Sequence, residues 1–121
     1  MKGADVIAVG PSRRAAVIEV KASNSTRFVT GFYQKYRTLE AEHPTFWVLY
    51  CCRREKEAYA ERFFVLTHLE LARCQAMRNT GDASTPHDEC ASRSAKGVDN
   101  VKLVDVEAFE DQWKKIAEWC A

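Results

Sequence analysis

Three charged side chains interrupt two apolar runs near the start of the chain. Residues 4–9 and 15–21 read ADVIAV and AAVIEVK, and they contain Asp5, Glu19 and Lys21. Side chains alternate between the two faces of a β-strand, so Glu19 and Lys21 point to the same side if residues 15–21 form a strand. Two carboxylates beside an ammonium group can bind a divalent cation, activate water and stabilise charge on a phosphate. This combination suits phosphodiester hydrolysis.

The separation of the two carboxylates depends on the register of the hairpin. The segment GPSRR lies between the runs, and its Gly and Pro indicate a turn. If Val9 pairs with Ala15, Asp5 lies directly opposite Glu19, with Cβ atoms about 4.5–5.5 Å apart. Like charges so close destabilise a sheet unless a cation lies between them, and the Val20 carbonyl could complete a partial cage for Mg²⁺ or Mn²⁺. A slip of one residue would separate the carboxylates, and the ExK pattern would then be the polar side of a half-exposed strand.

The following segments predict the elements that would hold these residues. Residues 45–52, TFWVLYCC, are almost uniformly apolar, which is typical of a strand covered on both faces. A charged connection, RREKEAYAE, leads to a shorter strand, RFFVLT, over residues 62–67. A helix over residues 28–42 is predicted before these strands, because apolar residues follow helical spacing and His43-Pro44 ends the pattern. The residues of this stripe are Val29, Phe32, Tyr33, Tyr36 and Leu39.

Two further helices and a long loop complete the predicted order. Thr67 and Glu70 have the spacing of a capping box, and they begin a helix that runs to about residue 78. Residues 79–96, NTGDASTPHDECASRSAK, are small, polar and turn-forming, which predicts a loop. A second apolar stripe predicts a C-terminal helix over residues 105–120, capped by its first aspartate. The fold class is therefore α/β, with a mixed β-sheet core flanked by helices in the order β-β-α-β-β-α-loop-α.

Length and composition limit the class of protein. A chain of 121 residues can bury one core but not two, so residues 1–121 are expected to form a single domain. The net charge of +1 excludes a uniformly basic DNA-binding protein but not a local basic face. The sequence contains neither an apolar run of roughly 18–20 residues nor a signal peptide, which predicts a cytoplasmic protein without a membrane partner. Five irregularly spaced cysteines fit reduced thiols rather than a disulfide framework.

The hairpin resembles the PD-(D/E)xK, or restriction-endonuclease-like, nuclease superfamily. ADVIAV, followed after a short turn by VIEVKAS, is similar to its motif, with Asp5, Glu19 and Lys21 matching its Asp, Glu and Lys. The predicted order of elements matches the family to about residue 78. The ending GVDNVKLVDVEAFEDQWKKI looks like that of small stand-alone bacterial members. The resemblance implies a restriction-endonuclease-like sheet and a nuclease dependent on Mg²⁺ or Mn²⁺, acting on DNA rather than RNA.

The resemblance also implies roles for individual residues. Asp5 and Glu19 would hold the metal, and Lys21 would serve the attacking water or the transition state. Family members normally begin with a helix and a strand, whereas only four residues precede Asp5 here. This difference predicts a fragment, a chain that borrows an element from a partner subunit, or a relative that does not cleave. An exposed sheet edge in place of the first strand would favour a homodimer.

Five further residues are candidates for contacts with nucleic acid. Some relatives, among them the resolvase-like nucleases, have a glutamine on the helix after the lysine, and Gln34 matches it as an auxiliary catalytic residue. Arg27 and Arg37 share the predicted helix face of Gln34 and could contact phosphates. Arg13 and Arg14, in the hairpin turn, could add backbone contacts. The alternatives are a solvated helix face and a turn whose charges only favour solubility.

Two other interpretations remain open at this point. Cys74, His87 and Cys90 could bind zinc, but no CxxC pair is present and no fourth ligand is evident. Alternatively, the same fold could lack catalysis and serve as a nucleic-acid-binding or protein-interaction module.

Overall fold

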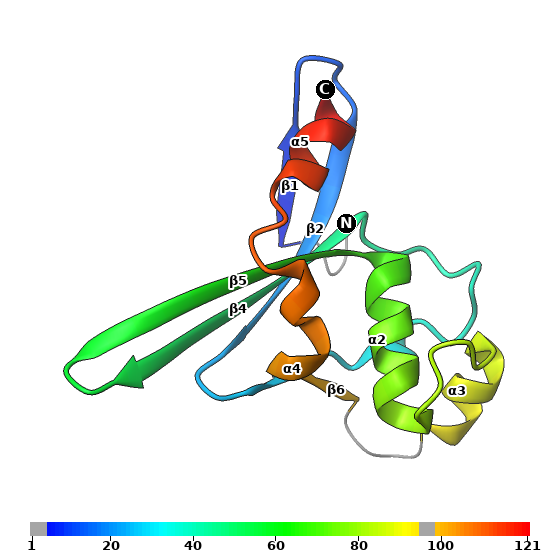
Figure 1. Cartoon of the computed structure of the whole chain (residues 1–121). Coiled ribbons are helices and arrows are strands. Elements are labelled where there is room, and N and C mark those ends of the chain that lie inside the picture. The colour runs from blue at the N-terminus through cyan, green and yellow to red at the C-terminus, as the bar shows by residue number, and fades with distance from the viewer. Residues whose placement is uncertain (1–4, 95–98) are drawn as a thin grey trace.

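The computed structural model describes residues 5–94 and 99–121. These residues form a mixed α/β fold with a four-stranded sheet of order β1-β2-β4-β5 and a separate two-stranded sheet, β3-β6. Figure 1 shows the β4–β5 hairpin extending away from the helices, while the β1–β2 hairpin rises beside the C-terminal helix. The strands of the larger sheet are β1 (Val6–Val9), β2 (Ala15–Ser23), β4 (Phe46–Glu55) and β5 (Ala58–Thr67).

The first hairpin has the predicted register. β1 and β2 are antiparallel, and Val9 pairs with Ala15 as expected. β2 then pairs in parallel with β4, and β4 pairs with β5 in an antiparallel hairpin. A parallel pair needs a crossover connection. Residues 24–45 supply it, and they contain β3 (Arg27–Val29) and α1 (Phe32–Lys35). The charged connection predicted after residues 45–52 is largely strand, because β4 and β5 continue to a tight turn at residues 56–57.

Each face of the larger sheet packs against its own group of residues. On one face, Trp47, Leu49 and Phe64 join the main core together with Leu71 of α2 (His68–Thr80). On the other face, a smaller cluster packs with the C-terminal helix α5 (Lys114–Cys120): Ala16, Ile18, Phe46, Val48, Val65 and Cys120. Because side chains alternate along β2, residues 17, 19 and 21 lie on the face of the main core.

The predicted helix over residues 28–42 is wrong except for one turn. Residues 27–29 form β3, which pairs with β6 (Asn100–Lys102), and only residues 32–35 are helical. Gly31 lies between them with φ 58°, a left-handed conformation that glycine adopts without strain and that separates strand from helix. The β-branched residues Val29 and Thr30 also favour strand over helix. The apolar stripe consequently splits, and Val29 and Leu39 are exposed.

The predicted loop over residues 79–96 is only partly correct. Its first two residues belong to α2, which ends at Thr80 before Gly81 with φ 81°. A further helix, α3 (His87–Arg93), follows Pro86 and carries two acidic residues in its first turn. Carboxylates at a helix N-terminus interact favourably with the helix dipole, and Cys90 and Ala91 anchor α3 in the core. Residues 95 and 96 lie outside the described part of the chain.

The predicted C-terminal helix over residues 105–120 is broken into three pieces. They are α4 (Leu103–Val106), the 3₁₀ turn η1 (Glu107–Phe109) and α5. Between η1 and α5 the backbone turns at Asp111, whose φ is 55° and whose N–H donates to the Phe63 carbonyl oxygen at 2.9 Å. Glu110 forms an isolated bridge with Phe64 of β5. These bonds satisfy backbone groups at the edge of the sheet, which outweighs continuation of the helical pattern.

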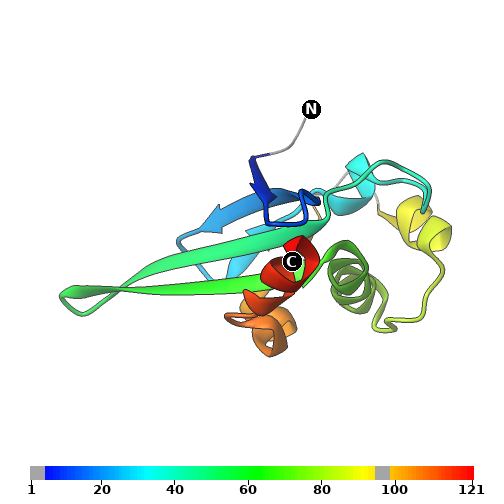
Figure 2. The same cartoon turned by 90° about the horizontal axis from the view of Figure 1, so that it is seen from above.

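The C-terminal helix fixes the turn of the first hairpin. The Ser12 hydroxyl donates to the Cys120 carbonyl oxygen at 3.0 Å, and the Trp119 indole donates to the Ala15 carbonyl oxygen at 3.1 Å. Figure 2 shows α5 over the middle of the molecule, with α2 and α3 side by side farther from the tip of the β4–β5 hairpin. Among the described residues, the helices are all too short or too polar to cross a membrane.

Candidate active site

Glu19 is the centre of a buried charge cluster on β2. Its side chain is 4% exposed, and its Oε1 atom lies 3.3 Å from the ammonium nitrogens of both Lys21 and Lys35. Lys21 is on the same strand and face, as the alternation of side chains predicts, whereas Lys35 comes from the end of α1. The other carboxylate oxygen, Oε2, is buried and has no hydrogen-bond partner among the described residues. A buried oxygen without a donor is costly, so this atom is the strongest local sign of a site that takes a cation or a hydrogen-bond donor.

Asp5 lies at the end of the neighbouring strand. Continuing the observed register by one residue beyond Val6 brings Asp5 opposite Glu19. The Asp5 N–H donates to the Ile18 carbonyl oxygen at 3.2 Å, and Asp5 Oδ2 accepts the Val20 N–H at 2.8 Å. The carboxylate thus continues the hydrogen-bond ladder where β1 ends. The Asp5 carboxylate therefore contacts the N–H of Val20. The sequence predicts a different role for Val20, in which the Val20 carbonyl oxygen shares a metal with the two carboxylates.

The position of Lys35 is set by buried contacts of the preceding loop. The Thr30 hydroxyl donates to Gln75 Oε1 of α2 at 2.6 Å, and both residues are buried. The Tyr33 N–H donates to a carboxylate oxygen of Asp99 at 2.8 Å. These bonds hold the start of the single turn that carries Lys35, so they set where its backbone lies.

The negative charge of Glu19 also affects the pKa of the next residue, Tyr36. Burial, and then the negative charge of Glu19, raise the pKa of Tyr36 to about 12. The phenol therefore stays neutral over the physiological pH range. It closes the cluster on the side of the main core, where its ring packs against Phe32 and Trp47.

The donor set fits a divalent cation that keeps much of its own hydration. Glu19 Oε2 has no hydrogen-bond partner among the described residues, and Asp5 has a second oxygen beyond the one that the Val20 N–H occupies. Within residues 5–94 and 99–121, there is no group of three or more His, Cys, Asp or Glu side chains that could enclose a metal. Mg²⁺ commonly binds one or two protein carboxylates and retains several waters, so two carboxylates suffice for it.

Two of the other predicted site residues make contacts elsewhere in the fold. Arg14 stacks on the Trp119 ring, 3.3 Å from its centroid, and Arg37 donates to the Ala91 carbonyl oxygen at 3.1 Å. Both guanidinium groups therefore join parts of the fold. Arg13, in the hairpin turn, and Gln34, on α1, are exposed.

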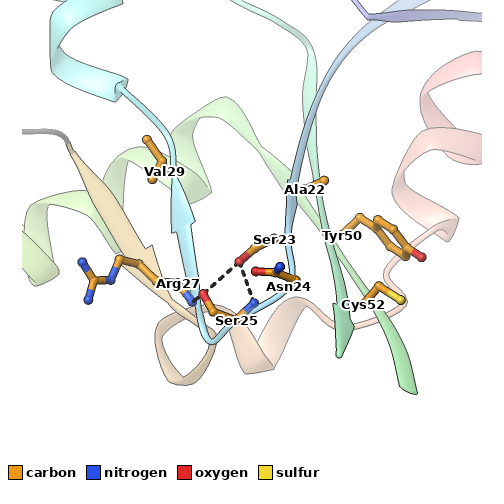
Figure 3. Close-up of a pocket in the computed structure, with 8 residues that line it drawn as sticks. All are labelled: Ala22, Ser23, Asn24, Ser25, Arg27, Val29, Tyr50 and Cys52. Atoms are coloured by element: carbon orange, nitrogen blue, oxygen red, sulfur yellow. Dashed lines mark hydrogen bonds between the residues drawn. The ribbon is translucent and has the colours of Figure 1, made fainter. Parts of the chain in front are cut away.

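Arg27 lines an open pocket of about 700 Å³ at the end of β2. Figure 3 shows that the Arg27 side chain points away from Ser23 and Asn24, while Tyr50 and Cys52 point to the opposite side. The polar groups of this pocket do not converge on one point. The pocket is therefore a concave continuation of the strand beyond Lys21 and has no defined site of its own.

The residues of the zinc interpretation are occupied elsewhere. The Cys74 thiol contacts the Asp105 carbonyl oxygen at 3.5 Å, and burial raises the pKa of Cys74 to about 11, which opposes the thiolate that zinc requires. A ring nitrogen of His87 bonds to the Tyr36 carbonyl oxygen. The zinc interpretation is therefore wrong for the described residues, which hold no such ligand group.

Comparison of the chain with models of known families, with curated proteins and with solved structures gave no match. What this protein does must therefore be inferred from its own residues. Lys35 is the one member of the charge cluster that the sequence analysis missed. Its only sequence signal is its place beside Gln34, and the contact with Glu19 depends on the turn at Gly31.

Proposed function

We propose that this chain is a metal-dependent nuclease of the PD-(D/E)xK, restriction-endonuclease-like type, acting on phosphodiester bonds of nucleic acid. The observation that carries the proposal is the Glu19 carboxylate, which is buried on a strand with one oxygen unpartnered and Lys21 at 3.3 Å from the other. Asp5 at the adjoining strand end supplies a second carboxylate. The mixed four-stranded sheet is consistent with the proposed fold.

Each residue has a role that its position supports. Glu19 and Asp5 hold Mg²⁺ or Mn²⁺, and the bound ion supplies Lewis acidity and lowers the pKa of water. Lys21 donates hydrogen bonds to the attacking water or to the phosphate oxygen on which charge develops. The concave surface beyond Lys21, with Arg27 at its margin, accommodates the neighbouring nucleotides, and DNA is the preferred substrate. Pairing of two copies along edge strand β1 is consistent with its exposed Val6, Ile7 and Val9.

The test is cleavage of DNA and RNA with Mg²⁺, Mn²⁺ or EDTA, in the wild type and in Glu19→Gln and Lys21→Met. We expect metal-dependent cleavage that each substitution lowers at least about 100-fold, because a positioned acid, base or metal ligand contributes on that scale. The matched controls are Glu118→Gln and Lys114→Met, which alter an exposed ion pair on α5 and should cleave at the wild-type rate. Circular dichroism checks that every variant folds. Cleavage that is unchanged in Glu19→Gln contradicts the proposal.

One observation favours a second candidate, a nucleic-acid-binding module without catalysis. Two ammonium groups already more than neutralise the charge of Glu19, so the buried carboxylate has positively charged partners without a metal. A binding module predicts nucleic-acid affinity that falls steeply with salt, equal with Mg²⁺ or EDTA, and no cleavage in either. The same cleavage and binding measurements distinguish the two candidates.

A further inference from the structure

The two oxygens of the Glu19 carboxylate differ in their partners. Both ammonium groups are 3.3 Å from Oε1, and neither is recorded at Oε2, which is buried without a partner. The two lysines bring two positive charges to one negative charge. A divalent cation at Glu19 would therefore lie close to two positive charges, which oppose its binding.

The two lysines differ in how firmly they are held. Lys21 is 27% exposed and lies next to Glu19 on the same face of β2, so its proximity is fixed by the strand. Lys35 is 48% exposed and reaches Glu19 from the last residue of a one-turn helix. Its side chain can swing into solvent without moving the backbone, because four methylene groups separate the ammonium group from α1. Lys35 is thus the lysine that can leave.

We infer that Lys35 is a built-in competitor for the Glu19 carboxylate, one that occupies Glu19 in the metal-free protein and withdraws when a divalent cation binds. The inference rests on the proposed function, because it concerns the metal site of that function. It gives the buried Glu19 carboxylate a charged partner in the metal-free protein. The consequence is a metal site whose affinity for a divalent cation is lowered by the positive charge of Lys35. The cation then binds only at higher concentrations.

The test is Mn²⁺ affinity of the full chain, measured without nucleic acid by calorimetric titration and by the electron paramagnetic resonance signal of free Mn²⁺. Lys35→Met keeps the length of the side chain and removes its charge. We expect it to bind Mn²⁺ about two- to fivefold more tightly than the wild type, the range set by the strength of a partly exposed ion pair. Lys114→Met removes the same charge from an 86% exposed position on α5 and should leave the affinity unchanged.

Two outcomes overturn the inference, and they differ in what else they remove. Mn²⁺ binding that Glu19→Gln abolishes, but that is equal or weaker in Lys35→Met than in the wild type, overturns the competitor role alone. Absence of Glu19-dependent Mn²⁺ binding in every variant overturns the competitor role and the proposed metal site together. Lys35→Gln, which also removes the charge, repeats the measurement if Lys35→Met does not fold.

Discussion

His68 predicts an acid-sensitive core beneath the candidate site. It is the first residue of α2, and its Nδ1 accepts the Trp47 indole N–H at 3.2 Å. Because an indole nitrogen can only donate, His68 Nδ1 must be unprotonated in this arrangement. Its ring stacks on His43, with centroids 3.9 Å apart. Burial, and then repulsion from His43 and His87, lower the pKa of His68 from 6.5 to about 3.

The sign and size of the effect follow from this pKa. The unfolded chain takes up the proton near pH 6.5 and the folded chain only near pH 3, so folding stability is fully present above pH 6.5 and falls as the pH drops towards 3. One pKa unit corresponds to about 1.36 kcal/mol, so lowering the pH from about 7 to about 5 should cost about 2 kcal/mol through His68 alone.

The control is His68→Gln, which still offers an acceptor to Trp47 but does not titrate. Urea unfolding, followed by tryptophan fluorescence at both pH values, gives the free energy of unfolding of each protein. We expect the wild type to lose about 2 kcal/mol more than His68→Gln between these pH values. Equal losses in the two proteins would refute the reasoning, because the carboxylates and the other histidines are common to both.

Two further predictions concern contacts that fix the site from a distance. A Cβ atom at Gly10 would lie 2.6 Å from Cys120 Cβ and closer still to the Cys120 carbonyl oxygen. Gly10→Ala should therefore displace α5 from the hairpin and lower the free energy of unfolding in urea by about 1–3 kcal/mol. An unchanged free energy of unfolding would contradict this packing. Gln75→Leu should cost about 1–3 kcal/mol, because the Thr30 hydroxyl and the Asn100 carbonyl oxygen each lose a buried partner. Adding Thr30→Val should recover part of that loss, and strictly additive losses would argue against the hydrogen bond.

Local patterns predicted the parts of the fold that local interactions decide. The first hairpin is joined by a short turn, and the structure has the pairing of Val9 with Ala15 on which the sequence prediction depended. The capping box of Thr67 and Glu70 is also present as predicted. By contrast, β3 exists because it pairs with β6, whose residues lie more than 70 positions later in the chain. A helical stripe around Phe32 gives no sign of that partner, and the pairing outweighs it.

The same distinction separates the candidate site residues. Glu19 and Lys21 are two residues apart on one strand, so the alternation of side chains alone brings them together. Lys35 is different, because its position depends on the turn at Gly31 and on the hydrogen bond from Thr30 to Gln75 of α2. Local sequence patterns do not predict such a contact.

The basic residues show how little residue type alone says about a partner. An arginine in a turn or on a helix face predicts a phosphate contact. In the structure, the guanidinium group of Arg14 stacks on an indole ring and that of Arg37 donates to a carbonyl oxygen of α3. A guanidinium group stacks on aromatic rings and bonds to backbone oxygens as readily as it binds phosphate, so its type and spacing do not reveal its partner. Glu19 is different, because a buried carboxylate oxygen without a donor is costly wherever it occurs. The proposed metal site therefore rests on Glu19, and the arginine positions add little to it.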